Sequence, residues 1–222
     1  MTFLIKQCYT KLVIMKVILV NGSPKKEGCS YTALTEVARA LNAHGVDTEI
    51  FWVGSKPLSG CTACLGCRKN NGGGCVIKDK VNEFVKVAES ADGFVFGSPV
   101  HFAAASGAIS CFLDRAFFSS SRDFRGKPGA AIVTLRRGGA SAAFDRLNKY
   151  FTFAQMPIVS SQYWSMVHGT TPEEIKQDLE GLQIMRTLGN NMAWLLKCID
   201  AGKKAGVEMP VLEKRISTGF VR

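Results

Sequence analysis

Four cysteines lie close together in the sequence, at Cys61, Cys64, Cys67 and Cys75. Closely spaced thiolates can wrap an iron–sulfur cluster corner by corner, and four thiolates can also bind zinc. A metal-free thiol loop is the third interpretation that this spacing leaves open. Disulfide bonds are not expected here, because we find no secretion signal and the cytosol keeps thiols reduced. The spacing therefore indicates metal, cluster or redox chemistry.

The chain around these cysteines, residues 54–78, shows no clear periodicity and is interpreted as an inserted loop. Three glycines, Gly72, Gly73 and Gly74, would let the backbone turn tightly and bring Cys75 to the other three thiols. The remaining cysteines are dispersed and are predicted to be structural: Cys8, Cys29, Cys111 and Cys198.

A second set of polar residues lies in the loop at 22–30, which follows an apolar strand and precedes a helix. The free backbone amides at the start of that helix form the positive end of its macrodipole, where a phosphate binds well. Lys25 adds charge, and Ser23, Ser30 and Thr32 add hydroxyl donors. The loop lacks the Walker lysine–serine pair, which argues against a nucleotide triphosphatase. We expect a phosphate site here; the alternative is a plain turn with a serine cap.

Two further loops follow strands. Residues 97–102 form a Gly-Ser-Pro turn before a stretch of small residues, and their backbone amides could reach the heteroatoms of a flat ring. An ordinary β-turn is the alternative for this motif. Residues 136–141 form another loop between a strand and a helix.

The elements that must position these loops alternate along the chain. Apolar, β-branched runs predict strands, and apolar residues at helical spacing predict helices. The predicted strands cover 16–21, 48–53, 93–99, 129–135 and 157–165. The predicted helices cover 31–45, 79–91, 105–118, 144–156 and 172–200. This alternation predicts an α/β fold with a doubly wound, five-stranded parallel sheet in three α/β/α layers. Ligands bind such sheets at the carboxyl ends of the strands, so all three loops should converge.

The chain is predicted to hold one domain, residues 15–200, because no linker or internal repeat divides it. Residues 1–14 are interpreted as an N-terminal extension and residues 201–222 as a polar, basic tail. The first residues lack the continuous apolar core and the cleavage site of a signal peptide, so we expect a cytoplasmic protein.

Bulk composition excludes several classes of protein. The 222 residues are 46% hydrophobic and 21% charged, which is ordinary for a globular protein. No apolar run approaches the ~20 residues of a membrane span. The net charge of +10 is scattered, with no run of five basic residues, so we expect a solvated basic surface and no nucleic-acid site.

Together, the loops NGSPKKEGCS and GSPVHFAAASGAISCFLDR and the Gly-Gly loop after the fourth strand resemble those of the NADPH-dependent FMN reductases and flavodoxin-like quinone reductases. The resemblance spans residues 15–165 and implies a flavodoxin-like fold that binds FMN. The phosphate loop of the family matches Ser23, Lys25, Cys29 and Ser30, beside Thr32. The loop along the isoalloxazine ring matches Ser98, Pro99, Val100, His101 and Phe102. The loop at the other edge of the ring matches Thr134, Arg136, Arg137, Gly138 and Gly139.

The chain departs from the family at two positions. Cys29-Ser30 stands where the family often has Asn-Thr, and only Ser30 preserves a hydroxyl. His101 stands where the family often has Tyr or Trp; it could stack or hydrogen-bond there, or be an ordinary loop histidine. Arg136 and Arg137 could stabilise reduced flavin or bind a pyridine nucleotide phosphate, or form a solvated surface pair.

The resemblance implies that NAD(P)H reduces the flavin, which then reduces a quinone, a flavin or another small acceptor. No catalytic triad is expected, because the chemistry belongs to the cofactor. The cysteine motif is similar to that of iron–sulfur flavoproteins, a related branch with a [4Fe–4S] cluster beside FMN. That branch implies the alternative of an electron carrier that uses ferredoxin and no nicotinamide. A third hypothesis is a thiol- or metal-based redox sensor. Related reductases also imply a homodimer or homotetramer.

Overall fold

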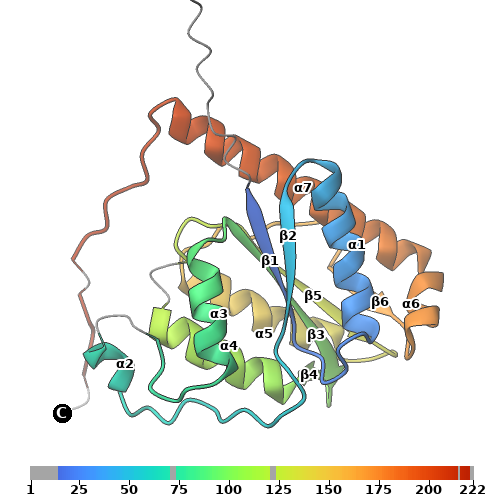
Figure 1. Cartoon of the computed structure of the whole chain (residues 1–222), viewed down its shortest axis with the longest axis horizontal. Helices are drawn as coiled ribbons and strands as arrows, with labels where there is room; N and C mark the ends of the chain where they lie inside the picture. Colours follow the sequence, from blue (N-terminus) through green and yellow to red (C-terminus); the bar gives the residue numbers. More distant parts are fainter. Residues whose placement is uncertain (1–14, 71–73, 121–123, 215, 221–222) are drawn as a thin grey trace, which may run out of the picture.

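A parallel β-sheet forms the centre of the molecule (Figure 1). The computed structural model describes residues 15–70, 74–120, 124–214 and 216–220. The parallel strands are β1 (Lys16–Asn21), β2 (Asp47–Trp52), β3 (Gly93–His101), β5 (Gly129–Leu135) and β6 (Met166–His168). Their order in the sheet is β2-β1-β3-β5-β6. A short strand, β4 (Ala104–Ala105), returns antiparallel on the end of β3. The predicted α/β fold with five parallel strands is confirmed.

Helices cover both faces of the sheet, as Figure 1 shows. One apolar cluster joins the sheet to α3 (Lys80–Glu89), α4 (Gly107–Ser120) and α5 (Ala140–Phe153). The other joins it to α1 (Cys29–Ala43), α6 (Pro172–Gln177) and α7 (Leu179–Lys204). The strands are buried on both sides because their side chains alternate between these clusters. In β1, for example, Ile18 and Val20 join the first cluster and Val17 and Leu19 the second.

The last strand lies later in the chain than the sequence predicts. Residues 157–165 were expected to form it, yet only an isolated bridge between Ile158 and Gly129 occurs there, and β6 begins at Met166. The apolar and aromatic composition of this segment is typical of a strand. However, Tyr163 and Trp164 are more than half exposed, so the segment loops out from the sheet edge instead of pairing along it. That prediction is wrong.

The predicted helix over 172–200 is two helices in the structure. The backbone breaks at Asp178, whose carboxylate caps α7 by accepting a hydrogen bond from the Gly181 amide at 2.9 Å. An aspartate at this position stabilises a new helix start, which a count of apolar spacing does not detect. The second helix then extends to Lys204, past the predicted end of the core.

The inserted segment 54–78 lies outside the sheet and contains one short helix, α2 (Gly66–Lys69), in its described part. After α7 the chain is extended, and Arg125 donates a hydrogen bond to the Pro210 carbonyl at 2.7 Å. Among the residues described, no helix is both long and apolar enough to cross a membrane. The predicted extension 1–14, Gly72, Gly73 and residues 221–222 lie outside the described residues.

Candidate functional site

The three predicted loops meet in one cavity of about 280 Å³ at the carboxyl end of the sheet. Of the residues predicted to bind the cofactor, nine line this cavity: Ser23, Lys25, Cys29, Ser30, Pro99, Val100, His101, Thr134 and Arg136. Most of the predicted site is therefore brought together by tertiary structure, from segments more than 100 residues apart in the sequence.

The first loop is held in shape by a buried asparagine. The Asn21 side chain accepts a hydrogen bond from the Ser23 amide at 3.0 Å and donates one to the Lys26 carbonyl at 2.9 Å. The Ser23 hydroxyl accepts from the Lys25 amide at 3.2 Å. Trp52 of β2 donates its indole N–H to the Ser23 carbonyl at 2.9 Å. These bonds curl the loop before any ligand binds, which lowers the entropic cost of binding.

Helix α1 begins beneath this loop with unsatisfied amides. Its N-cap residue is Gly28, and no side chain among the described residues caps it. Gly28, Cys29 and Ser30 all line the cavity, so the positive end of the helix faces the open space. The Ser30 and Thr134 hydroxyls lie 2.8 Å apart in the buried wall. This arrangement suits a phosphate group, which accepts several hydrogen bonds at a helix start.

The second loop bends into a tight hairpin beside the cavity. Pro99, Val100 and His101 line the cavity, whereas the side chain of Phe102 is fully exposed. Phe102 and Ala103 form the turn with φ angles of 49° and 58°, a conformation that non-glycine residues adopt at a cost. Ser98 is buried and hydrogen-bonds the Pro99 carbonyl, so it supports the loop without lining the cavity.

In the third loop, Thr134 and Arg136 line the cavity, but Arg137, Gly138 and Gly139 do not. Gly139 has a φ of 91°, and a β-carbon there would lie 2.5 Å from Cα of Ala103. A glycine is required because the third loop packs directly against the hairpin of the second. Gly139 is therefore a spacer between the two loops. Thr32 also lies outside the lining, and its hydroxyl donates to the Gly28 carbonyl at 3.2 Å.

The sequence analysis missed the fourth loop of the cavity. Gly169, Thr170 and Pro172 line it and follow β6 directly. The signal was present, because loops after parallel strands line such sites, but the misplacement of the last strand hid it. Thr170 donates hydrogen bonds to Glu174, and these lower the pKa of that carboxyl; the largest effect is the hydroxyl bond.

Cys29 is half-buried in the cavity wall. Burial raises the pKa of its thiol, and this outweighs the lowering effects of its own backbone amide and of Lys25. The thiol therefore stays protonated near neutral pH and behaves as a small apolar group.

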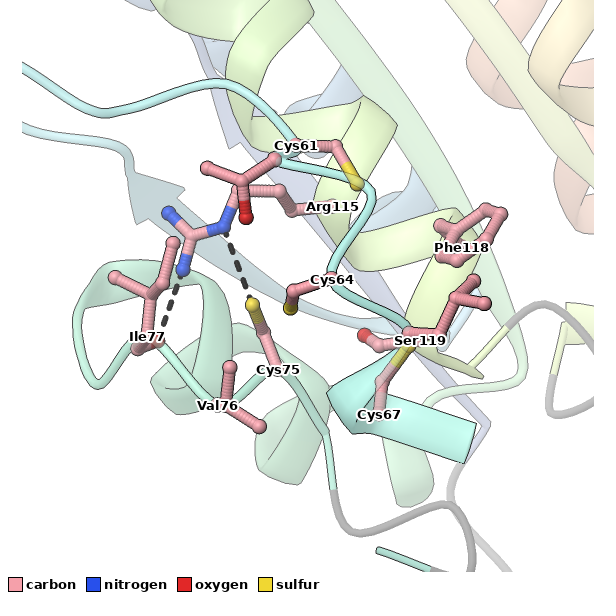
Figure 2. Close-up of a pocket in the computed structure, with 11 residues that line it drawn as sticks. Cys61, Cys64, Cys67, Cys75, Val76, Ile77, Arg115, Phe118 and Ser119 are labelled. Carbon is pink, nitrogen blue, oxygen red and sulfur yellow. Dashed lines mark hydrogen bonds between the residues drawn. The ribbon is translucent and has the colours of Figure 1, made fainter. Parts of the chain in front are cut away.

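A separate pocket gathers the four clustered cysteines, as Figure 2 shows. Cys61, Cys64 and Cys67 approach it from one stretch of the loop and Cys75 from the returning stretch, and Phe118 and Ser119 of α4 also line it. The pocket measures about 20 Å³, which is room for about one water molecule. The sequence predicted that these thiols would converge, and the structure brings all four to one space.

Polar contacts hold Cys75 in place. The Asn82 side chain of α3 accepts a hydrogen bond from the Cys75 amide at 2.9 Å and donates to the Cys75 and Ile77 carbonyls, both at 3.0 Å. Gly74 precedes it with a φ of 85°, and a β-carbon there would lie 2.8 Å from the Asn82 side-chain oxygen. The predicted need for glycine before Cys75 thus holds at Gly74.

The stretch of the cysteine loop around Cys64 has a less regular backbone. Ala63 and Leu65 both have left-handed backbone angles, at φ 53° and 56°. Between them, Cys64 is exposed, and its thiol pKa is lowered, first by a hydrogen bond from the Gly66 amide and then by the Thr62 hydroxyl. Such a thiol becomes a thiolate, the form that binds metal, more readily than an isolated cysteine does.

Comparison with known proteins places the chain in a family. A model described as NADPH-dependent FMN reductase matches residues 15–171. The chain belongs to this family. It is also similar to iron–sulfur flavoproteins: one of Methanocaldococcus jannaschii is 31% identical and covers 83% of this chain and 99% of its own length. One of Archaeoglobus fulgidus is 29% identical, with 82% and 97% covered.

Solved structures show the same fold for this member of the FMN reductase family. The NAD(P)H:(acceptor) oxidoreductase FerB of Paracoccus denitrificans superposes with a TM-score of 0.60 over 83% of this chain and 98% of FerB. At 15% identity, this likeness concerns the fold alone.

The residues present fit the FMN of the family. The cavity combines uncapped helix amides, a lysine and two hydroxyls at one end with the backbone of a tight hairpin along its side. The cysteine pocket offers the kind of ligands that an iron–sulfur cluster needs, because four thiols line the same space. Among the described residues no three His, Cys, Asp or Glu side chains lie close enough to hold one metal ion, so the loop would have to rearrange to bring the four thiols onto one cluster.

Proposed function

We propose that the protein is an electron-transfer flavoprotein that holds FMN in the cavity at the sheet edge and a [4Fe–4S] cluster in the cysteine pocket. The observation that carries this proposal is the convergence of Cys61, Cys64, Cys67 and Cys75 on a single pocket of a chain from the FMN reductase family. When bound, the two cofactors supply one-electron steps at the cluster and one- or two-electron steps at the flavin.

The residues of the chain bind and orient these groups. Lys25 and the start of α1 neutralise the FMN phosphate, and the hairpin at Pro99–His101 supports the ring. The four thiolates bind the cluster. The names of the relatives support this assignment, because two whose length this chain spans almost completely are iron–sulfur flavoproteins.

A second proposal concerns the electron donor. Arg136 lines the flavin cavity and offers a cation to a pyridine nucleotide phosphate beside the ring. This favours NAD(P)H as a direct reductant, with a quinone, a flavin or a similar small molecule as acceptor. Ferredoxin is the alternative electron partner, and we expect the working form to be a homodimer or homotetramer.

Anaerobic purification followed by measurement of FMN, iron and acid-labile sulfide per chain tests the main proposal. We expect one FMN and four iron atoms per chain. Cys64→Ala should lose the iron and keep the flavin, whereas Cys198→Ala, which changes an exposed cysteine outside the pocket, should keep both. Flavin without iron would overturn the cluster assignment, and a chain without flavin would favour a thiol-based sensor.

The same preparation tests the donor. NADPH or NADH added without oxygen should bleach the flavin absorption, which a stopped-flow experiment follows over time. Bleaching by reduced ferredoxin alone would contradict the nicotinamide proposal and leave the electron-transfer proposal intact.

A further inference from the structure

A buried arginine faces the cysteine pocket from the side opposite the cysteine loop. Arg115 belongs to α4, and its side chain is only 1% exposed. Its neighbours on this helix, Phe112 and Ala116, are core residues. An arginine is almost never fully buried unless it is paired, so this side chain requires an explanation beyond packing.

Every N–H of this guanidinium is directed at the cysteine loop or at Asp79, which directly follows it. Nε donates to Sγ of Cys75 at 3.4 Å, a contact drawn in Figure 2. Nη2 donates to the Ile77 carbonyl at 2.8 Å and to Asp79 at 3.0 Å. Nη1 donates to Asp79 at 2.6 Å and to the Ser59 carbonyl at 3.4 Å. The five donors therefore tie both ends of the cysteine loop to α4.

Only arginine can make this set of contacts. Its planar fork has five donors in fixed directions, whereas lysine has three donors on one atom. The guanidinium forms an ion pair with the Asp79 carboxylate at 2.6 Å, which compensates its positive charge in this buried place. Asp79 itself is fixed at the N-cap of α3, where it accepts from the Val81 amide at 3.0 Å.

We propose that Arg115 is the positioning residue of the Cys75 ligand and that the Arg115–Asp79 pair sets the reduction potential of the cluster. This inference rests on the proposed function. A donor and a positive charge beside a cluster sulfur stabilise the reduced, more negative state and so raise the potential. The Asp79 carboxylate offsets part of that charge. Removal of the two partners should therefore move the potential in opposite directions.

The test compares Arg115→Met with Asp79→Asn in the cluster-loaded protein by a redox titration followed by electron paramagnetic resonance. Arg115→Met should shift the one-electron equilibrium toward the oxidised cluster by about tenfold, or ~59 mV to lower potential. Asp79→Asn should raise the potential, and its fold should persist because asparagine is also a good N-cap. Arg115→Lys should keep part of the charge effect while it loses the hold on Ser59 and Ile77.

A hydrogen-exchange measurement and a control variant separate this role from a merely structural one. Hydrogen exchange in the cluster-free protein should show faster exchange at residues 74–79 in Arg115→Met, with β1 and β3 unchanged. Arg146→Met, which removes a partly exposed arginine that pairs with Asp114 and does not line the cysteine pocket, should change neither exchange nor potential. Because Asp79→Asn keeps the cap, it still reports the potential if Arg115→Met does not fold.

The outcomes are distinct. A wild-type chain that binds no iron overturns the proposed function and with it this role. A cluster that loads normally but has the same potential in Arg115→Met and Asp79→Asn overturns the inference alone. Shifts of the same sign in both variants also overturn it, because loosening of the loop does not depend on the sign of the charge removed.

Discussion

The flavin cavity and the cysteine pocket are held by different parts of the fold. The cavity is built on the ends of parallel strands, and the hydrogen-bonded ladder of β1, β3 and β5 sets the relative positions of its loops. The cysteine pocket is built from an irregular segment with two left-handed, non-glycine residues, and polar side chains hold it. The cavity measures about 280 Å³, whereas the cysteine pocket measures only about 20 Å³.

This difference indicates that one site is preorganised and the other completes itself around its ligand. The sheet forms whether or not FMN is present, so the amides that bind phosphate already face the cavity. The cysteine loop is held by hydrogen bonds from Arg115 and Asn82, and a bound metal would add to its order. Metal binding to such a segment contributes to its folding free energy.

Helix α4 joins the two sites. Near its start, the Ile109 side chain packs so closely on the first loop that a β-carbon at Gly22 would lie 2.6 Å from it. Near its end, Arg115 and Phe118 line the cysteine pocket. A helix rises about 1.5 Å per residue, so this one element spans about 9 Å along its axis from Ile109 to Arg115.

The largest effect is expected at the phosphate end of the cavity. Replacing both Ser23 and Lys25 with Ala removes a hydroxyl and a cation that line it, at about 3 kcal/mol together, so FMN should bind about 100-fold more weakly. Flavin fluorescence titration measures the affinity, and circular dichroism should show the fold unchanged. Lys26→Ala is the control, because that exposed neighbour does not line the cavity. Unchanged flavin affinity in the double variant would contradict the phosphate assignment.

A smaller effect is expected at the cysteine pocket. Asn82→Ala removes three hydrogen bonds to Cys75 and Ile77, which together contribute about 3 kcal/mol at about 1 kcal/mol net each. These bonds hold the loop and do not contact the iron, so we expect only about half of that energy in the barrier to iron release, and a chelator should remove iron about tenfold faster. FMN affinity should not change. Glu83→Ala, which alters only an exposed pair with Lys80, is the control. Equal iron loss in both variants would show that the loop does not depend on Asn82.

The smallest effect concerns the chemical reactivity of the two sites. In the cluster-free protein, iodoacetamide should modify Cys64 several-fold faster than Cys29 near neutral pH, because the pKa of Cys64 is lowered and that of Cys29 is raised. The ratio should fall as the pH rises, since both thiols then ionise. Peptide mass mapping over time gives both rates. Faster modification of Cys29 would mean that its helix-end position outweighs its burial.

Local patterns were enough to predict most of the fold and three of the four cavity loops. Apolar, β-branched runs such as 16–21 and 129–135 are typical of strands in a parallel sheet, because both faces of such a sheet are buried, and both form strands here. The last strand was misplaced because Tyr163 and Trp164 look like strand residues while they project into solvent. Because of that error, the loop with Gly169 and Thr170 was not predicted to line the cavity. Arg115 was missed because no spacing rule links a helix residue to a cysteine 40 residues earlier in the chain. Asn82 was missed because no pattern indicates that a helix side chain bonds the backbone of a loop residue seven positions before it.

The amino-acid sequence by itself determined the strand and helix alternation, the phosphate loop and the cysteine spacing, because these depend on the chemistry of near neighbours. Tertiary structure alone decided which residues share a cavity: that Thr134 meets Ser30, that Gly139 separates two loops, and that a buried arginine holds Cys75. Such contacts come from chain topology, which places the ends of distant strands and helices side by side.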